Sequence, residues 1–312
     1  MIILLTIFKI ETLNIKHLRH SEINKKKWDD AITISENALV YALSWYLDIV
    51  SPNWEALIVG DYEIVMPLTV RKKYGLKYII QPPFTQQLGI FNQSGTKVNV
   101  DLFLDKIPSC YMYVNINFNS GNSKGFKHSY LKRLNYELDL DSSYENIHSG
   151  FNTNTKRNIK KSLQKDLKIR NDIKLEELID FKKKHAVEKI SDKHYDILKQ
   201  LCLNAEMIGV GRSESVVEVD DGNLVSATFL IEKFDRIIYL ISASSIIGKE
   251  KSANFFLINE LIKKNSSKKR ILDFEGGIIS GLSRFFKGFG AHEKEYYNVI
   301  INRLPWPLKH LR

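Results

Sequence analysis

The chain has 312 residues, of which 44% are hydrophobic and 26% are charged, and its net charge is +10 with a pI near 9.3. This composition is typical of a globular protein about two average domains long, with a large core. Its two cysteines match no metal spacing and its eight histidines form no H-x-x-x-H pair, so we expect neither a disulfide framework nor a metal site. A reduced, cytoplasmic location fits this cysteine usage best.

The charge and the N-terminus each leave two interpretations open. A net charge of +10 favours polyanionic partners such as tRNA, nucleotide phosphates or an anionic membrane surface contacted peripherally, or it reflects a solvated lysine-rich surface. The apolar start MIILLTIF is too short to span a bilayer and lacks the basic region and cleavage site of a signal peptide. Residues 1–13 are therefore either an extension or an edge strand.

In the first half, two predicted helices precede a predicted hairpin. Ser21 is placed to cap a helix through Ile34, and Asn37–Val50 forms a second helix that Ser51-Pro52 ends. Trp54–Val59, the turn Gly60-Asp61 and Tyr62–Leu68 have the pattern strand, tight turn, strand. Further on, strands are expected at Tyr78–Gln81, Met112–Phe118 and Asn135–Leu140, with a helix at Lys97–Ile107.

Aromatic and amide side chains in this half suggest a binding groove. Such side chains suit the orientation of a polar substrate, so we expect a groove shared with the second half of the chain. Its expected lining residues are Trp45, Tyr46, Gln81, Gln86 and Gln87. The alternative is that the aromatics are core residues and the amides belong to a loop.

The second half opens with a strongly basic helix. Asn154 or Thr155 is placed to cap it, and Lys156 and Lys160, like Arg157 and Lys161, are one turn apart. We expect Lys156, Arg157 and Lys160 to contact an anionic substrate; the alternative is a solvated basic face. Helices are then expected at Leu175–Val187, Asp192–Ile208 and Ala253–Lys264, and antiparallel strands at Ser215–Val219, Leu224–Ile231 and Arg236–Ser244.

The stretch Leu272–Gly290, LDFEGGIISGLSRFFKGFG, concentrates the chemistry. Asp273 and Glu275 in a strand would point to one face, and Gly276-Gly277 would then break the strand. Phenylalanines at helical spacing follow, with Lys287 among them. Carboxylates, a glycine turn and a lysine suit a site that handles protons and developing negative charge. The alternative is a solvated strand face and a surface lysine.

Each half contains two helices followed by strand, Gly/Asp turn and strand, in Ala56–Leu68 and in Ser215–Ile231. This internal repeat predicts two copies of one α/β unit with mixed sheets. We place the domains at residues 1–145 and 146–312, with the candidate site at Leu272–Gly290 in the second.

The segments DFEGG and GLSRFFKGFG, with the basic run NTNTKRNIKKSLQKDLKI, resemble the Fem-like (FemABX) branch of the GNAT acyltransferases. The first-half run YALSWYLD, WEALIVGDYEIVMPL and QPPFTQQLGIF looks like Fem-like proteins of Bacteroidetes. The resemblance covers most of the chain and implies two tandem GNAT-like domains and acyl transfer to an amine. In the peptidyltransferases of the family a Phe-Lys pair stabilises the anionic tetrahedral intermediate, and Phe286-Lys287 matches it.

The resemblance implies no tightly bound cofactor, and acyl-CoA, acyl carrier protein or aminoacyl-tRNA as donor. Ser242–Ser252, which takes the place of a Gly-rich pyrophosphate loop, contains only Gly248, and no long heptad segment for tRNA is present. An anion could still bind at the N-terminus of the helix that follows. We therefore expect donor contacts from Ser242, Ser244, Lys251, Ala253 and Asn254.

The leading interpretation is an N-acyltransferase in which Glu275 or Asp273 accepts the amine proton and Lys287 stabilises the oxyanion. The acceptor would be the amine of a small molecule or of a cell-wall or glycan precursor. Two alternatives stay open: a peptidoglycan-type aminoacyltransferase that uses aminoacyl-tRNA, and a non-catalytic basic module associated with RNA or the cell envelope.

Overall fold

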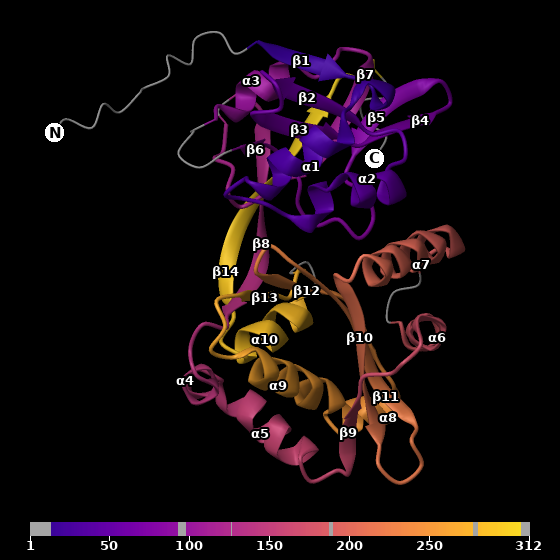
Figure 1. Ribbon diagram of the computed structural model, residues 1–312, viewed down its shortest axis with the longest axis vertical. Coiled ribbons are helices and arrows are strands. Elements are labelled where there is room, and N and C mark those ends of the chain that lie inside the picture. The colour runs from indigo at the N-terminus through magenta and orange to yellow at the C-terminus, as the bar shows by residue number, and fades with distance from the viewer. Residues whose placement is uncertain (1–13, 93–97, 126, 187–189, 277–279, 307–312) are drawn as a thin grey trace, which may run out of the picture. The chain divides into compact units, whose positions relative to one another are not determined.

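The computed structural model describes residues 14–92, 98–125, 127–186, 190–276 and 280–306, so the expectation for residues 1–13 lies outside the described residues. The protein is mixed α/β, as predicted, and divides into two compact units (Figure 1). Unit 1 comprises Met1–Pro82, Gln87–Leu131 and Tyr297–Arg312, and unit 2 comprises Pro83–Gln86 and Lys132–Tyr296. The domain bounds 1–145 and 146–312 stay a prediction.

Unit 1 is built on two groups of strands. Its four-stranded sheet has the order β1-β2-β3-β6, with bounds Ile15–Leu18, Glu55–Val59, Ile64–Leu68 and Phe91–Asn92. The second group runs β4-β5-β7-β14, with bounds Val70–Lys73, Leu76–Ile80, Tyr111–Phe118 and His292–Asn302. The helices are α1 (Lys25–Thr33), α2 (Ser44–Val50) and α3 (Val100–Asp105), with 3-10 turns at His20–Glu22 and Val40–Ala42. Buried side chains of α3 pack with those of both strand groups into one apolar core.

Two helix starts in unit 1 differ from the prediction. The first helix begins at Lys25, because the side chain of Asn24 and not of Ser21 accepts a backbone N–H of its first turn. The helix expected at Asn37–Val50 is a 3-10 turn followed by α2. The Asp29 carboxylate accepts bonds from the Ser44 N–H at 2.7 Å and from the Ser44 hydroxyl at 2.6 Å, and these bonds start α2 at Ser44.

Unit 2 holds the sheet order β8-β13-β12-β11-β10-β9. The bounds in that order are Ser129–Asp139, Ile271–Asp273, Arg236–Ser244, Leu224–Lys233, Gly211–Glu218 and Leu167–Arg170. β12 and β13 are parallel, and the predicted antiparallel run β10-β11-β12 is confirmed. The helices are α4 (Tyr144–Ser149), α5 (Thr153–Ser162), α6 (Leu175–His185), α7 (Asp192–Met207), α8 (Ile246–Glu250), α9 (Ala253–Asn265) and α10 (Ser280–Gly288). As in unit 1, two helices are followed by a hairpin.

The two faces of the β8-β13-β12 region differ in chemistry. Leu272 lies opposite Leu138 and Asp273 opposite Glu137, and side chains alternate between the faces of a strand. Tyr136, Leu138 and Leu272 pack with α9 and α10 in the apolar core, and we call this side the core face. The other side carries Asn135, Glu137, Arg236 and Asp273, and we call it the polar face.

No helix among the described residues is both long and apolar enough to cross a bilayer. Within the same residues, no three His, Cys, Asp or Glu side chains lie together in a way that could hold a metal ion.

Candidate functional site

β13 is short and ends in a backbone turn. The N–H of Glu275 donates to Asp273 Oδ1 at 2.9 Å, and Glu275 and Gly276 have φ values of +51° and +58°. Few residues other than glycine adopt this left-handed region, so the Asp273 carboxylate holds the backbone in a conformation that glutamate does not favour. The expectation that Asp273 and Glu275 share one strand face was therefore wrong. The strand ends at Asp273, and the alternation does not reach Glu275.

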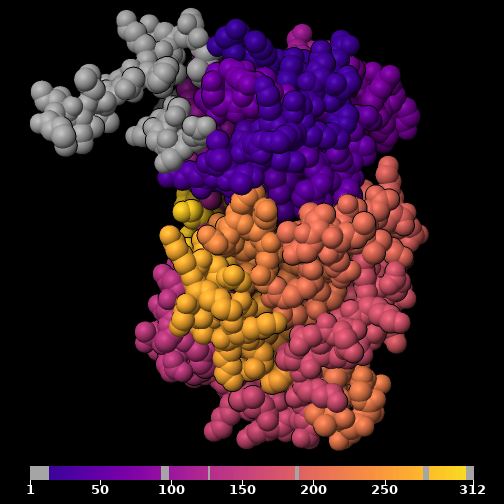
Figure 2. Space-filling model, viewed as in Figure 1, coloured from indigo at the N-terminus to yellow at the C-terminus, as the bar shows by residue number. Residues whose placement is uncertain are grey.

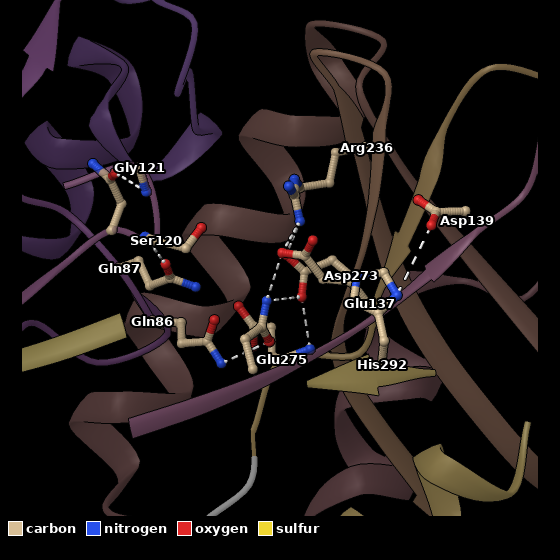
Figure 3. Close-up of polar contacts among 12 residues, drawn as sticks. Gln86, Gln87, Ser120, Gly121, Glu137, Asp139, Arg236, Asp273, Glu275 and His292 are labelled. Carbon is tan, nitrogen blue, oxygen red and sulfur yellow. Dashed lines mark hydrogen bonds and ion pairs between the residues drawn. The ribbon is translucent and has the colours of Figure 1, made fainter. Parts of the chain in front are cut away.

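Asp273 belongs to a buried ion network on the polar face (Figure 3). Arg236 Nη1 lies 2.7 Å from Asp273 Oδ2 and 2.8 Å from Glu137 Oε1. The exposed fractions of the side chains are 16% for Arg236, 5% for Glu137 and 1% for Asp273. A solvated strand face is thus excluded for Asp273.

Two amides complete the network. Asn135 Nδ2 donates to Asp273 Oδ1 at 2.9 Å and to Glu137 Oε1 at 3.1 Å, and Gln86 Nε2 donates to Asn135 Oδ1 at 3.1 Å. Each bond gives a buried polar group a partner, as burial requires. The structure thus brings together Gln86, Asp273 and Glu275 of the expected site residues.

The network contains two carboxylates and one guanidinium. Burial raises the pKa of Asp273, the Arg236 charge opposes that rise, and the Glu137 charge adds to it. Burial by itself would lower the pKa of Arg236, but the two carboxylates raise it overall, so the guanidinium stays charged. Burial also raises the pKa of Tyr296 to about 12, with further contributions from Glu275 and Asp273, so this phenol stays protonated near the network.

Lys287 lies in the last turn of α10 and is half exposed. Its Nζ is 2.5 Å from Glu293 Oε1 and 5.9 Å from the centre of the Tyr136 ring, and the side chain is 50% exposed. The hydrogen bond with Glu293 raises the pKa of Lys287, so the side chain is a cation at neutral pH. It therefore has the charge that an oxyanion-stabilising group needs.

Phe286 is a core residue. Its ring stacks on Phe274 at 4.7 Å with an interplanar angle of 18°, and it lies 6.2 Å from the ring of Tyr136. Tyr136 lies on the core face, whereas Asp273 and Glu137 lie on the polar face. The structure thus groups Lys287 with Phe286 and Tyr136, and it groups Asp273 with Glu137 on the polar face. Glu275 lies in the turn beyond the end of β13 and belongs to neither face.

The remaining amide and aromatic residues of the expected groove belong to unit 1. Tyr46 is fully buried and packs against Trp45, which is half-buried. The side-chain oxygen of Gln81 accepts the N–H of Asn117, and that of Gln87 accepts the N–H of Ser120, both at 2.9 Å. These contacts make Tyr46 a core residue and give the amides structural partners, and a substrate role for the set stays a prediction.

The expected donor residues surround the start of α9. Ser242 and Ser244 close β12, and Ser226 hydrogen-bonds to Asn254 Oδ1 and to Ser244 Oγ at 2.5 and 3.2 Å. Lys251 pairs with Glu218. The predicted loop Ser242–Ser252 contains the short helix α8. A Cβ on Gly248 would lie 2.0 Å from the carbonyl oxygen of Val225, so this glycine is required for close packing.

The basic helix is α5, and Asn152 supplies its cap instead of Asn154 or Thr155. Lys156 is half-buried, and its Nζ donates to the Ser149 carbonyl at 2.9 Å, while Arg157 and Lys160 are exposed. Among the described residues, no ion pair joins these three cations to a carboxylate. In the space-filling view, the pink atoms of α5 and of the turn into β9 form part of the visible surface of unit 2 (Figure 2).

No family model matches the sequence, and no curated protein matches it. Solved structures do match. FemX has a TM-score of 0.66 and 14% identity, over 95% of this chain and 99% of that chain. A tandem GNAT protein from the clavulanic acid biosynthesis pathway, without AcCoA, has a TM-score of 0.53 and 9% identity over 93% and 99%. L-PGS from Bacillus licheniformis has a TM-score of 0.50 and 9% identity over 83% and 87%.

The chain has the Fem-like, tandem GNAT fold. This confirms the fold expected from the resemblance, while the likeness to Bacteroidetes proteins stays a prediction. Within the Fem-like fold, the Phe286-Lys287 pair ends α10 and the DFEGG segment forms β13 and its turn.

Three residues of the network were missed in the sequence: Asn135, Glu137 and Arg236. A signal was present for the first two, since the polar residues Asn135, Glu137 and Asp139 alternate with apolar ones. Arg236 follows the hairpin turn and starts a strand, a position that usually indicates a solvated charge, so nothing local marked it as buried.

Proposed function

We propose that this protein is an N-acyltransferase that moves an acyl or aminoacyl group from an activated donor to an amine. The observation that carries the proposal is the turn at Glu275, in which a buried network fixes a carboxylate-bearing residue in the left-handed region. Residues in such sparsely populated conformations cluster at active sites, where the surrounding structure over-determines them. The Fem-like fold supports the same reaction class.

In the proposed reaction the acceptor nitrogen attacks the carbonyl carbon of the donor, and a C–N bond forms. Glu275 takes the proton that leaves the nitrogen, and the Lys287 ammonium stabilises the oxyanion. Collapse of the tetrahedral intermediate breaks the C–S bond of a thioester or the C–O bond of an ester, and the leaving group takes the proton from Glu275. Asp273 is only 1% exposed, so we assign the base to Glu275.

We propose a phosphate-bearing donor: acyl-CoA, acyl carrier protein or aminoacyl-tRNA. The proposed contacts are the hydroxyls of Ser242 and Ser244, the Lys251 ammonium, and the first N–H groups of α9 at Ala253 and Asn254. A glycine-rich loop is replaced here by α8, whose one glycine packs against β11. This supports a donor that is held by fewer backbone contacts than a pyrophosphate loop would supply.

Replacing Lys156, Arg157 and Lys160 together by alanine is expected to weaken the affinity for a phosphate-bearing donor or acceptor. With a nucleic-acid donor, each lost phosphate contact should also reduce the salt dependence of binding by about one unit of the logarithmic slope. The melting temperature should change little, because Arg157 and Lys160 are exposed and the half-buried Lys156 makes one exposed hydrogen bond, to the Ser149 carbonyl. A titration of donor binding at several salt concentrations measures both effects. An unchanged affinity and slope would show that α5 does not contact the phosphate-bearing substrate.

The reaction class is tested by offering the three donors separately, each with a small amine and with a cell-wall glycopeptide amine as acceptor. Mass spectrometry of the products should show an amide from one donor. Glu275→Gln serves as the matched control and should bind the same donor while forming product far more slowly. Failure of all donor and acceptor pairs to give an amide would contradict the proposal.

The cations of α5 favour one alternative in particular, a peptidoglycan-type aminoacyltransferase that uses aminoacyl-tRNA. Salt-dependent binding of tRNA without turnover would instead favour a non-catalytic basic module associated with RNA or the envelope. We further propose a cytoplasmic protein that meets a small-molecule or cell-wall precursor amine, with peripheral membrane contact if that precursor is a lipid.

A further inference from the structure

We infer that Arg236 and Asp273 are positioning residues that hold Glu275 in its left-handed conformation and thereby set where its carboxylate lies. The role of Glu275 as the base rests on the proposed function. We call the hydrogen bonds by which Arg236 and Asp273 hold this backbone conformation the clamp. The clamp concerns only the folded chain, so the positioning role and the proposed function can fail separately.

The two oxygens of the Asp273 carboxylate have different partners: one binds Arg236, and the other binds Asn135 and the backbone of Glu275. Its Oδ2 receives Arg236 Nη1 at 2.7 Å, and its Oδ1 receives Asn135 Nδ2 and the Glu275 N–H, both at 2.9 Å. Because Arg236 and Asn135 fix the carboxylate plane from two sides, Oδ1 stays directed at the backbone of residue 275. Charge-assisted bonds of this kind are about twice as strong as neutral ones.

The turn at Glu275 differs from two exposed left-handed positions of the chain, those of Tyr74 and Ser267. Both residues have positive φ values, but both lie in exposed turns, and the N–H of Ser267 donates to the backbone carbonyl of Ser142 instead of a side chain. At Glu275 the N–H is bound by a carboxylate that is almost fully buried. The conformation is therefore imposed by the buried ion network of the polar face, and a glycine at this position would adopt it without that network.

A double-mutant cycle in melting temperature tests the clamp without any assay of activity. Asp273→Ala removes the acceptor of the Glu275 N–H and leaves Glu137 and Arg236 as a balanced pair, so this variant should fold. The drop in melting temperature that it causes should fall to less than half in a Glu275→Gly background, because glycine adopts the turn without being held. It should be unchanged in the matched Ser267→Gly background. Equal drops in all three backgrounds would overturn the inference.

If Asp273→Ala does not fold, Arg236→Lys is measured in the same three backgrounds and must show the same reduction. The activity test then uses the donor that supports turnover. Asp273→Ala should lower kcat by about tenfold to a hundredfold, since misplacing a reacting group is costly, while the KM for the acceptor stays within about twofold. Arg236→Lys should retain more of kcat than Arg236→Met. Wild-type kcat in Asp273→Ala would overturn the positioning role, whereas the absence of turnover in the wild type refutes only the proposed function.

Discussion

Replacing Lys287 by methionine is expected to slow acyl transfer by about 100- to 1,000-fold, the usual loss when one oxyanion donor is removed. Methionine keeps much of the apolar stem and removes only the charge. The lysine is 50% exposed and pairs with Glu293 at the surface, so the melting temperature should stay within about 2 °C of the wild type. Single-turnover kinetics with the active donor, alongside thermal melting, measure both expectations.

Lys132→Met is the matched control for this variant. Lys132 is also an exposed lysine in an ion pair, with Glu295, and it should keep the wild-type rate when replaced. If Lys287 and Glu275 serve one transition state, Lys287→Met and Glu275→Gln should be less than additive. Wild-type turnover in Lys287→Met would remove the oxyanion role, and a collapsed melting transition would show that the lysine is structural.

The strands were the most predictable part of the fold, because their signals are local. Arg236–Ser244 was placed with the bounds that β12 has, since its apolar run lies between a turn and a polar segment. The hairpin β2-β3 followed in the same way from Gly60-Asp61 between two apolar runs. Helix starts were less predictable, because the side chain that begins α2 is Asp29, which lies fifteen positions before Ser44.

The ion network could not be predicted because it depends on strand register. Asn135 and Asp273 are 138 positions apart, and they meet only because β8 and β13 are neighbours in one sheet. A shift of one residue would have turned Glu137 toward the core face. The pairing of two carboxylates with one buried arginine is therefore a property of the assembled sheet.

The turn at Glu275 had a sequence signal that the strand pattern concealed. An aspartate side chain readily accepts the N–H two residues later, and Asp273 followed by Phe274-Glu275-Gly276 fits that turn. The strand interpretation instead extended the alternation of side chains to Glu275, two residues beyond the observed end of β13 at Asp273. Tyr46 shows the related problem for aromatics, since composition does not distinguish a ring that binds a substrate from one that is fully buried.

Arg236→Met is expected to be the most destabilising of the proposed single substitutions, by about 3–5 kcal/mol, because it leaves two carboxylates in the protein interior without their cation. Chemical denaturation at neutral pH measures the loss. Arg270→Met is the matched control. Its guanidinium pairs with Glu232 at 3.2 Å and both side chains are partly exposed, so its replacement should cost less than about 1 kcal/mol.

The pH dependence of this loss separates charge from packing. Burial raises the pKa of Asp273 above the value of 3.8 that it has in the unfolded chain, and removing Arg236 removes the main opposing effect. Above the folded pKa the variant holds an unpaired buried charge and is least stable. As the pH falls through that pKa the native state binds a proton before the unfolded chain does, so stability recovers until the pH approaches 3.8. Adding Glu137→Gln and Asp273→Asn to Arg236→Met should recover much of the loss at neutral pH and flatten this dependence. A loss that is the same at every pH, and in the triple variant, would mean that Arg236 acts by packing alone.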